Sequence, residues 1–192
     1  MAKESSFKNM VITLLVISFF ASAALGGVYL VTLKPIEAAK AKKINDAIQK
    51  VVPAFDNNPG DDIYKIAIDG DTLRLYPARK GGKLVGTAIE TFTNKGFSGH
   101  FTLMVGLLPD GTINSVEVLS HKETPGLGDK MEKNKSNFSV QFEGKNPATF
   151  KMMVKKDGGD VDAITASTIT SRAFTDAVNR AYNTYMKGGK HE

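Results

Sequence analysis

The sequence has no cysteine among its 192 residues and only three histidines, His100, His121 and His191. A chain without cysteine forms no disulfides, thiolate metal sites or cysteine-ligated iron–sulfur clusters, and it has no cysteine nucleophile. The histidines are far apart along the chain, and none stands in a metal-ligand pattern. The sequence therefore offers no metal centre and no nucleophile–base pair of its own, so any chemistry would be that of a bound cofactor.

The net charge of +5 is not concentrated in one part of the chain. The lysines are scattered rather than grouped with aromatic residues, so no nucleic-acid partner is predicted. Hydrophobic residues make up 42% and charged residues 23% of the sequence, as in ordinary folded proteins. The length fits one domain, or one domain with a membrane anchor.

One long hydrophobic run lies near the N-terminus, from Met10 to Leu33, and it contains no charged residue. About 20 apolar residues suffice to cross a bilayer, so this run predicts a membrane span. Ala21-Ser22-Ala23 resembles a signal-peptidase site, but the hydrophobic run continues well beyond it. We therefore expect an uncleaved single-pass anchor over residues 1–34, with a cleaved signal peptide as the alternative. Lysines flank the run on both sides, so the positive-inside rule gives little help with its orientation.

The rest of the chain predicts a short helix followed by a sheet domain. Beyond Pro35, apolar residues at helical spacing predict a juxtamembrane helix that ends near Val52, within a segment of residues 35–55. In the domain of residues 56–192, strand-forming runs alternate with turns such as Asp69-Gly70-Asp71, and short connections favour antiparallel pairing. The predicted strands are 63–68, 72–77, 84–92, 101–108 and 112–119, with a strand or a covering loop at 138–142 and a further strand at 150–154.

A C-terminal helix follows a run of small and hydroxyl residues. Apolar residues at helical spacing mark one face from Ser171 to Met186, and the run Asp162–Ser171 precedes it. A helix start offers unpaired N–H groups and a partial positive charge, which suit a phosphate, although an ordinary Ser/Thr cap has the same pattern. The predicted fold is α+β: an N-terminal transmembrane helix, a mainly antiparallel sheet domain and a C-terminal helix beginning near Thr168.

Within that run, Asp162-x-x-Thr165-Ala166-Ser167-Thr168 resembles the flavinylation motif of the bacterial FMN-binding domain family. In that family a flavin transferase takes FMN from FAD, with magnesium, and esterifies its phosphate to the last threonine of the motif. The resemblance therefore implies covalent FMN on Thr168, with Asp162, Thr165 and Thr168 recognised by the transferase. This chain has Ile169 where the family often has a further hydroxyl residue.

A second stretch, Glu123-Thr124-Pro125-Gly126-Leu127-Gly128, is typical of a Pro-Gly turn and also resembles the family's Glu-Thr-Pro-Gly-Leu-Gly motif at all six positions. Gly96-Phe97-x-Gly99 and Val105–Gly111 match as well, so the resemblance covers roughly residues 96–181. Glycines allow a backbone to approach a planar ring. For Lys156 the alternative to a flavin contact is an ordinary solvated lysine. Besides Thr168, the flavin contacts implied are Glu123, Thr124, Gly126, Leu127, Gly128, Lys156, Thr165, Ala166, Ser167 and Thr170.

The resemblance also implies a function, which is electron transfer by FMN within a membrane complex. By size, the chain is nearest to the G subunit of the Rnf complex, the ion-translocating ferredoxin:NAD oxidoreductase. Its partners would be the other membrane proteins of that complex and a flavin transferase during maturation. The domain would lie on the periplasmic side of the bacterial inner membrane. The alternatives are the C subunit of the sodium-pumping NADH:quinone reductase, a membrane-tethered flavin-binding sensor, or a structural domain without cofactor.

Overall fold

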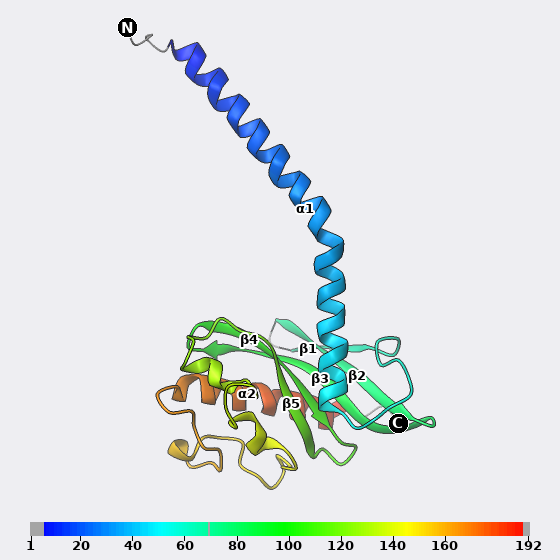
Figure 1. Cartoon of the computed structure of the whole chain (residues 1–192). Helices are drawn as coiled ribbons and strands as arrows, with labels where there is room; N and C mark the ends of the chain where they lie inside the picture. Colours follow the sequence, from blue (N-terminus) through cyan, green and yellow to red (C-terminus); the bar gives the residue numbers. More distant parts are fainter. Residues whose placement is uncertain (1–5, 69, 190–192) are drawn as a thin grey trace. The chain divides into compact units, whose positions relative to one another are not determined.

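A computed structural model describes residues 6–68 and 70–189. The chain divides into two compact units, Met1–Lys43 and Ile44–Glu192. Helix α1, Phe7–Val51, is 45 residues long and continues from the first unit into the second (Figure 1). The second unit contains the remaining helices and all the strands, so it holds the folded domain.

Helix α1 contains the hydrophobic run that predicts a membrane span. Its most apolar 18-residue window has a mean hydropathy of 2.3, and none of that window is buried. By length and composition the helix is able to cross a membrane. Pro35 lies inside α1, so the segments expected before and after it form one helix. A proline removes one hydrogen bond of a helix, but the residues on both sides favour helix here, and the helix continues through it.

The five predicted strands are all present, as β1 Tyr64–Ile68, β2 Asp71–Lys80, β3 Lys83–Gly96, β4 Gly99–Leu107 and β5 Ile113–Ser120. They form one antiparallel sheet in the order β1-β2-β3-β4-β5, as the short connections predicted. Around the β2–β3 and β3–β4 turns the strands are longer than predicted, because pairing continues almost to the turn residues. Asp69 of the predicted first turn lies outside the described residues.

The sheet is covered on both faces, because alternate residues of each strand point to opposite sides. Helix α2, Thr168–Thr184, packs on one face, and a π-helical turn, Tyr185–Gly189, follows it. The last turns of α1 pack on the other face through Ala47, Ile48 and Val51. Figure 1 shows α2 and the end of α1 with the sheet between them. The α+β fold is therefore confirmed.

The segment between β5 and α2 contains three 3₁₀ helices, η1 Gly128–Met131, η2 Ser139–Phe142 and η3 Lys155–Asp157. Of the two interpretations of residues 138–142, the covering loop is correct. Phe138 and Phe142 are buried, and their ring centroids lie 5.2 and 5.0 Å from that of Phe174 in α2. The two phenylalanines therefore reflect burial in the core and not strand pairing.

The strand predicted at 150–154 was wrong. Its only pairing among the described residues is a single parallel bridge between Val154 and Val161. The segment turns too tightly for a ladder, because the N–H of Phe150 bonds back to the carbonyl of Asn146 and that of Met153 to the carbonyl of Lys151. These local bonds use the groups that a neighbouring strand would need.

Candidate functional site

A cavity of about 310 Å³ lies where the Glu123–Gly128 loop meets the start of α2. A volume of this size is at the lower end of those that hold cofactors and small ligands. The fold thus brings together the two motifs that the sequence singled out, although they are about 40 residues apart. The residues that line the cavity are Phe97, Glu123, Thr124, Leu127, Gly128, Ala166, Ser167, Thr168, Ile169 and Thr170.

The start of α2 contributes one wall of the cavity and has the features of an anion site. Ser167 is the N-cap residue, but its side chain makes no capping hydrogen bond. The first turn of α2 contains no acidic residue. The N–H groups of this turn keep the partial positive charge of a helix start, and the carboxylate of Glu123 in the same cavity bonds to the hydroxyl of Thr170 and the N–H of Ser98 rather than to these groups. A phosphate is the type of ligand that such a site binds well.

A tight turn places the start of α2 in this position. The N–H of Ser167 donates to the carbonyl of Ile164 at 2.9 Å. Ala166, inside the turn, has a φ of 61° and is the only residue other than glycine with positive φ in the described chain. The hydroxyl of Ser171 accepts the N–H of Ile164 at 2.9 Å and donates to the carbonyl of Ser167 at 3.0 Å. The turn is therefore fixed to the helix by a buried side chain.

The hydroxyl groups around the cavity differ in what they already bind. Thr170 is buried, and its hydroxyl donates a 2.7 Å hydrogen bond to Oε2 of Glu123. Thr168 is half-buried and lines the cavity, and its hydroxyl makes no hydrogen bond to any residue in the described part of the chain. Thr165 is exposed and does not line the cavity. Thr168 thus lines the cavity with a hydroxyl that remains available for a new bond, as do Ser167 and Thr124, whose hydroxyls also make no hydrogen bond within the described residues.

Glu123 lines the cavity and connects three segments. Its Oε1 accepts the N–H of Ser98, at the turn between β3 and β4, at 3.0 Å, while Oε2 accepts the hydroxyl of Thr170. Its own N–H donates to Nδ1 of His121 at 3.1 Å, and Nε2 of His121 lies 2.8 Å from Oε1 of Glu132. The carboxylate of Glu123 is therefore held from both sides.

Three large apolar side chains lie around the same cavity. Phe97 is 67% exposed, Ile169 48% and Leu127 40%. Apolar side chains exposed around a concave site are typical of ligand or partner binding. The cavity thus combines a helix start suited to phosphate with apolar walls suited to a planar ring, which are the two chemical parts of a flavin nucleotide.

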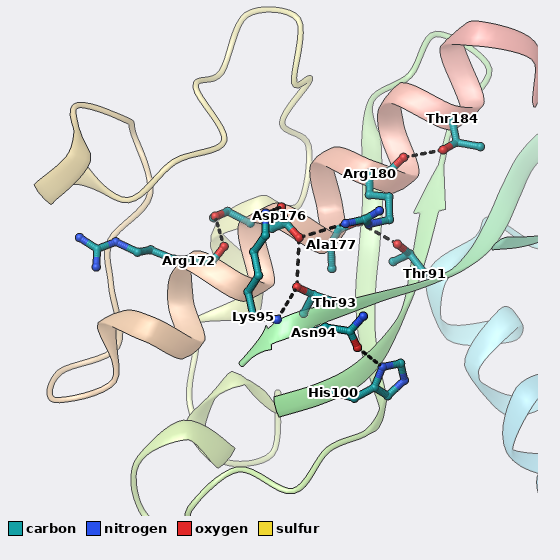
Figure 2. A network of polar contacts seen from close by, with 11 residues as sticks. Thr91, Thr93, Asn94, Lys95, His100, Arg172, Asp176, Ala177, Arg180 and Thr184 are labelled. Carbon is teal, nitrogen blue, oxygen red and sulfur yellow. Dashed lines mark hydrogen bonds and ion pairs between the residues drawn. The ribbon is translucent and has the colours of Figure 1, made fainter. Parts of the chain in front are cut away.

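A larger cavity of about 460 Å³ lies near the other end of α2, lined among others by Lys95, Asp176 and Arg180. Here the charged groups bind one another. Asp176 accepts from Lys95 at 2.6 Å and from Thr93 at 3.0 Å, and Arg180 lies 3.4 Å from it, as Figure 2 shows. The Arg180 guanidinium also stands 4.8 Å from the ring centroid of Phe92. This network ties α2 to β3, and we favour the smaller cavity as the functional site because both motifs line it.

Comparison with known proteins shows the family to which the chain belongs. Residues 96–183 match the FMN-binding domain family. The G subunit of the ion-translocating oxidoreductase complex of Erwinia tasmaniensis is 37% identical over 178 residues, which cover 88% of this chain and 85% of the relative. The G subunit of the same complex in Vibrio cholerae is 34% identical, with 87% and 86% covered, and that of Cereibacter sphaeroides is 37% identical, with 78% and 70% covered. The chain belongs to the G-subunit family of ion-translocating oxidoreductase complexes.

In this G-subunit chain, the structure places eight of the residues implied by the resemblance around the cavity. Gly126, Lys156, Thr165 and Asp162 do not line it. Gly126 has a φ of 77° and open space where a Cβ would stand. Asp162 is exposed and pairs with Lys155 at 2.7 Å, and Lys156 is exposed in η3. The eight are Glu123, Thr124, Leu127, Gly128, Ala166, Ser167, Thr168 and Thr170.

Two cavity residues of this G-subunit chain were not predicted from its sequence. Phe97 stands in the Gly96-Phe97-x-Gly99 pattern, which supported the resemblance without suggesting a role for the aromatic ring. Ile169 was noted only because it replaces a hydroxyl residue. In the structure both side chains line the cavity. An aromatic residue in a glycine-bounded turn, where burial is not expected, was the available indication for Phe97.

Proposed function

We propose that this protein is the electron-transfer G subunit of an Rnf-type ion-translocating oxidoreductase complex and that it carries FMN bound by its phosphate to Thr168. The observation that carries the proposal is the cavity itself, in which the unbonded hydroxyl of Thr168 faces the same space as the Glu123–Gly128 loop. The membership in the G-subunit family supports the assignment to a multi-subunit redox complex.

The attachment is a phosphoryl transfer from FAD. The Oγ1 atom of Thr168 attacks the phosphorus on the FMN side of the pyrophosphate, AMP leaves with the bridging oxygen, and the hydroxyl proton passes to a base or to solvent. The product is a phosphodiester between Thr168 and FMN, and no oxidant or reductant is needed. A flavin transferase with magnesium would supply the catalytic groups, with Asp162 and Thr165 as part of the exposed sequence that it recognises.

The residues of this chain would bind and orient the cofactor. The first turn of α2 would hold the phosphate through its N–H groups, since the carboxylate of Glu123 bonds to Ser98 and to the hydroxyl of Thr170 and does not occupy them. Phe97, Leu127 and Ile169 would contact the apolar ring system, and Thr124 would offer a polar group at its edge. When bound, FMN supplies the chemistry, which is to accept electrons and pass them on.

The experiment that tests attachment replaces Thr168 by alanine, with Thr168→Ser as the matched control that keeps a hydroxyl. Both variants are produced with a flavin transferase in the same host. Thr168→Ala should give no fluorescent band under ultraviolet light on a denaturing gel, whereas Thr168→Ser should keep at least part of the fluorescence. Undiminished fluorescence in Thr168→Ala would move the attachment site to Thr165, Ser167 or Thr170 and would defeat the proposal.

Membrane position is part of the same proposal. We propose that α1 anchors the chain in the bacterial inner membrane and that the domain lies on the periplasmic side. Protease added to intact spheroplasts should then digest the domain, with a cytoplasmic marker protein left whole as the control. Digestion only after lysis would instead place the domain in the cytoplasm.

A further inference from the structure

The carboxylate of Glu123 is buried among three segments that are distant in sequence. Its side chain belongs to the Glu123–Gly128 loop, Ser98 to the turn between β3 and β4, and Thr170 to α2. Only 5% of the residue is exposed, yet it lines the cavity. One side chain therefore connects the proposed ring-binding loop to the helix turn that carries Thr168.

Two glycines make room for this carboxylate. A Cβ at Gly128 would overlap Oε2 of Glu123 and lie 2.9 Å from Oγ1 of Thr170. A Cβ at Gly96 would overlap the carbonyl oxygen of Gly99 and lie 2.7 Å from Oε1 of Glu123. Separations this short are not found for real Cβ atoms. The carboxylate therefore fills the space beside Gly128, and at Gly96 it shares the space with the main chain of the β3–β4 turn.

This burial needs an explanation, because a buried carboxylate is unfavourable unless it is well paired. Glu123 accepts two hydrogen bonds, but it has no ion pair among the described residues. A neutral side chain could join the same segments without placing a negative charge in the cavity wall. The charge itself is therefore the feature that suggests a role in the site.

We propose that Glu123 is a positioning residue that holds the Glu123–Gly128 loop and the first turn of α2 in register, and that its negative charge lowers the reduction potential of the flavin. This inference rests on the proposed function and deepens it. Reduction adds electrons to the flavin, and a fixed negative charge in a partly buried site opposes that change. The register of the two segments would in turn decide whether the hydroxyl of Thr168 faces the cavity.

The test uses the full-length protein and compares Glu123→Gln with Glu123→Ala. The amide of glutamine can accept from the N–H of Ser98 and donate to the hydroxyl of Thr170, so Glu123→Gln keeps the connection and removes the charge. Glu123→Ala removes both. Glu117→Gln, in β5, paired with Lys50 and outside the cavity lining, is the matched control for loss of a carboxylate elsewhere in the domain.

Two measurements separate the two parts of the proposal. In protein made without flavin transferase, amide hydrogen exchange in residues 164–171 should be at least tenfold faster in Glu123→Ala and unchanged in Glu123→Gln. In flavin-loaded protein, Glu123→Gln should favour the reduced flavin at least tenfold more, which is a rise of about 30 mV for a two-electron couple. Glu117→Gln should change neither quantity.

The possible results lead to different conclusions. Unchanged hydrogen exchange in Glu123→Ala would overturn the positioning role, and an unchanged potential in Glu123→Gln would overturn the role of the charge. If Glu123→Ala does not fold, Thr170→Val tests positioning, since it keeps the shape of the side chain and breaks the bond to Glu123. Unchanged hydrogen exchange in Thr170→Val would likewise overturn the positioning role. A Thr168→Ala protein that still carries covalent flavin would defeat the proposed attachment, while the exchange result, measured without flavin, would stand.

Discussion

Gly106 of β4 lies against the main-chain carbonyl of Val51, the last residue of α1. A Cβ at position 106 would overlap the oxygen of Val51 and come within 2.9 Å of its Cβ. The same carbonyl accepts a 2.8 Å hydrogen bond from Nδ2 of Asn114 in β5. The end of α1 is thus seated on the sheet by a close approach that only glycine permits, together with a side-chain bond to one of its terminal carbonyls.

Replacing Gly106 by alanine should therefore lower the free energy of unfolding by about 1–3 kcal/mol, the range typical of overpacking. Gly60→Ala is a suitable control, because the nearest atom to a Cβ there is the Oδ1 atom of Asn58 at 3.4 Å. Thermal unfolding of the detergent-solubilised protein, followed by circular dichroism, measures both. Equal unfolding midpoints for the two variants would contradict the close packing of α1 on β4.

The second prediction concerns pH and the Asp176 network of Figure 2. Burial raises the pKa of Asp176, but hydrogen bonds from Lys95 and Thr93 and the charges of Lys95 and Arg180 lower it by more, to below its ordinary value of 3.8. A carboxyl whose pKa is lower in the folded state stabilises the fold above its unfolded pKa, and that contribution is lost as the pH falls through the folded pKa.

Asp176→Asn should consequently lower the free energy of unfolding by about 1.5–3 kcal/mol at neutral pH, the range for hydrogen bonds to charged groups. The difference in free energy of unfolding between the variant and the parent protein should shrink as the pH falls below about 4, where the carboxyl of the unfolded chain becomes protonated. Urea unfolding at a series of pH values measures this. A difference that stays constant down to the lowest pH would show that the charge of Asp176 does not stabilise the fold.

The third prediction concerns the turn before α2. Ala166 has a φ of 61°, a left-handed conformation that is unfavourable for alanine by about 1–2 kcal/mol. Ala166→Gly should relieve this strain and raise the free energy of unfolding by up to about 1 kcal/mol, after allowance for the greater freedom of glycine in the unfolded chain. Gly126→Ala, at a φ of 77° with no atom nearby, should have the opposite sign. Urea unfolding of the two variants measures both changes. If the free energy of unfolding changed with the same sign in both, the backbone conformation of one of these turns would be contradicted.

Sequence patterns predicted the parts of the fold that depend on local chemistry. Alternating residues and short turns located all five strands, and the hydroxyl-rich run located the start of α2 at Thr168. The error at Phe150–Val154 arose because the segment has the composition of a strand, whereas local turns take its backbone hydrogen bonds. The sequence left open whether 138–142 is a strand or a covering loop, and a distant contact decides it, since Phe138 and Phe142 both pack on Phe174. Tertiary packing commonly overrides local propensity in this way.

The candidate site shows the same division. The resemblance named Thr168 and the Glu123–Gly128 loop, and the structure brings both to one cavity. It did not indicate that Glu123 bonds to Thr170, or that Phe97 stands beside them. Those relationships join three segments of the chain, and no spacing within a single segment encodes them. For the same reason, the glycine at 128 was expected to admit a flavin ring, whereas in the structure the space beside it is filled by Glu123.

The last prediction uses that difference. Gly128→Ala should displace the Glu123 carboxylate and break its bond to Thr170, because the new Cβ would overlap both Oε2 and the Cβ of Glu123. Gly126→Ala is the matched control in the same loop, since it strains the backbone but touches neither group. Both variants should be less stable than the parent protein. Gly128→Ala should lose about 1–3 kcal/mol because of overpacking, and Gly126→Ala about 1–2 kcal/mol because its backbone is left-handed.

The flavin distinguishes the two variants where stability does not. If Glu123 positions the first turn of α2, Gly128→Ala should carry less covalent flavin, and the flavin that it does carry should have a shifted visible absorption band and reduction potential. Gly126→Ala should keep the flavin content, spectrum and potential of the parent protein. Gel fluorescence, absorption spectra and redox titration of the two folded variants provide the comparison. The reverse pattern, with a changed flavin in Gly126→Ala alone, would place the backbone at 126 against the ring and remove Glu123 from its proposed role.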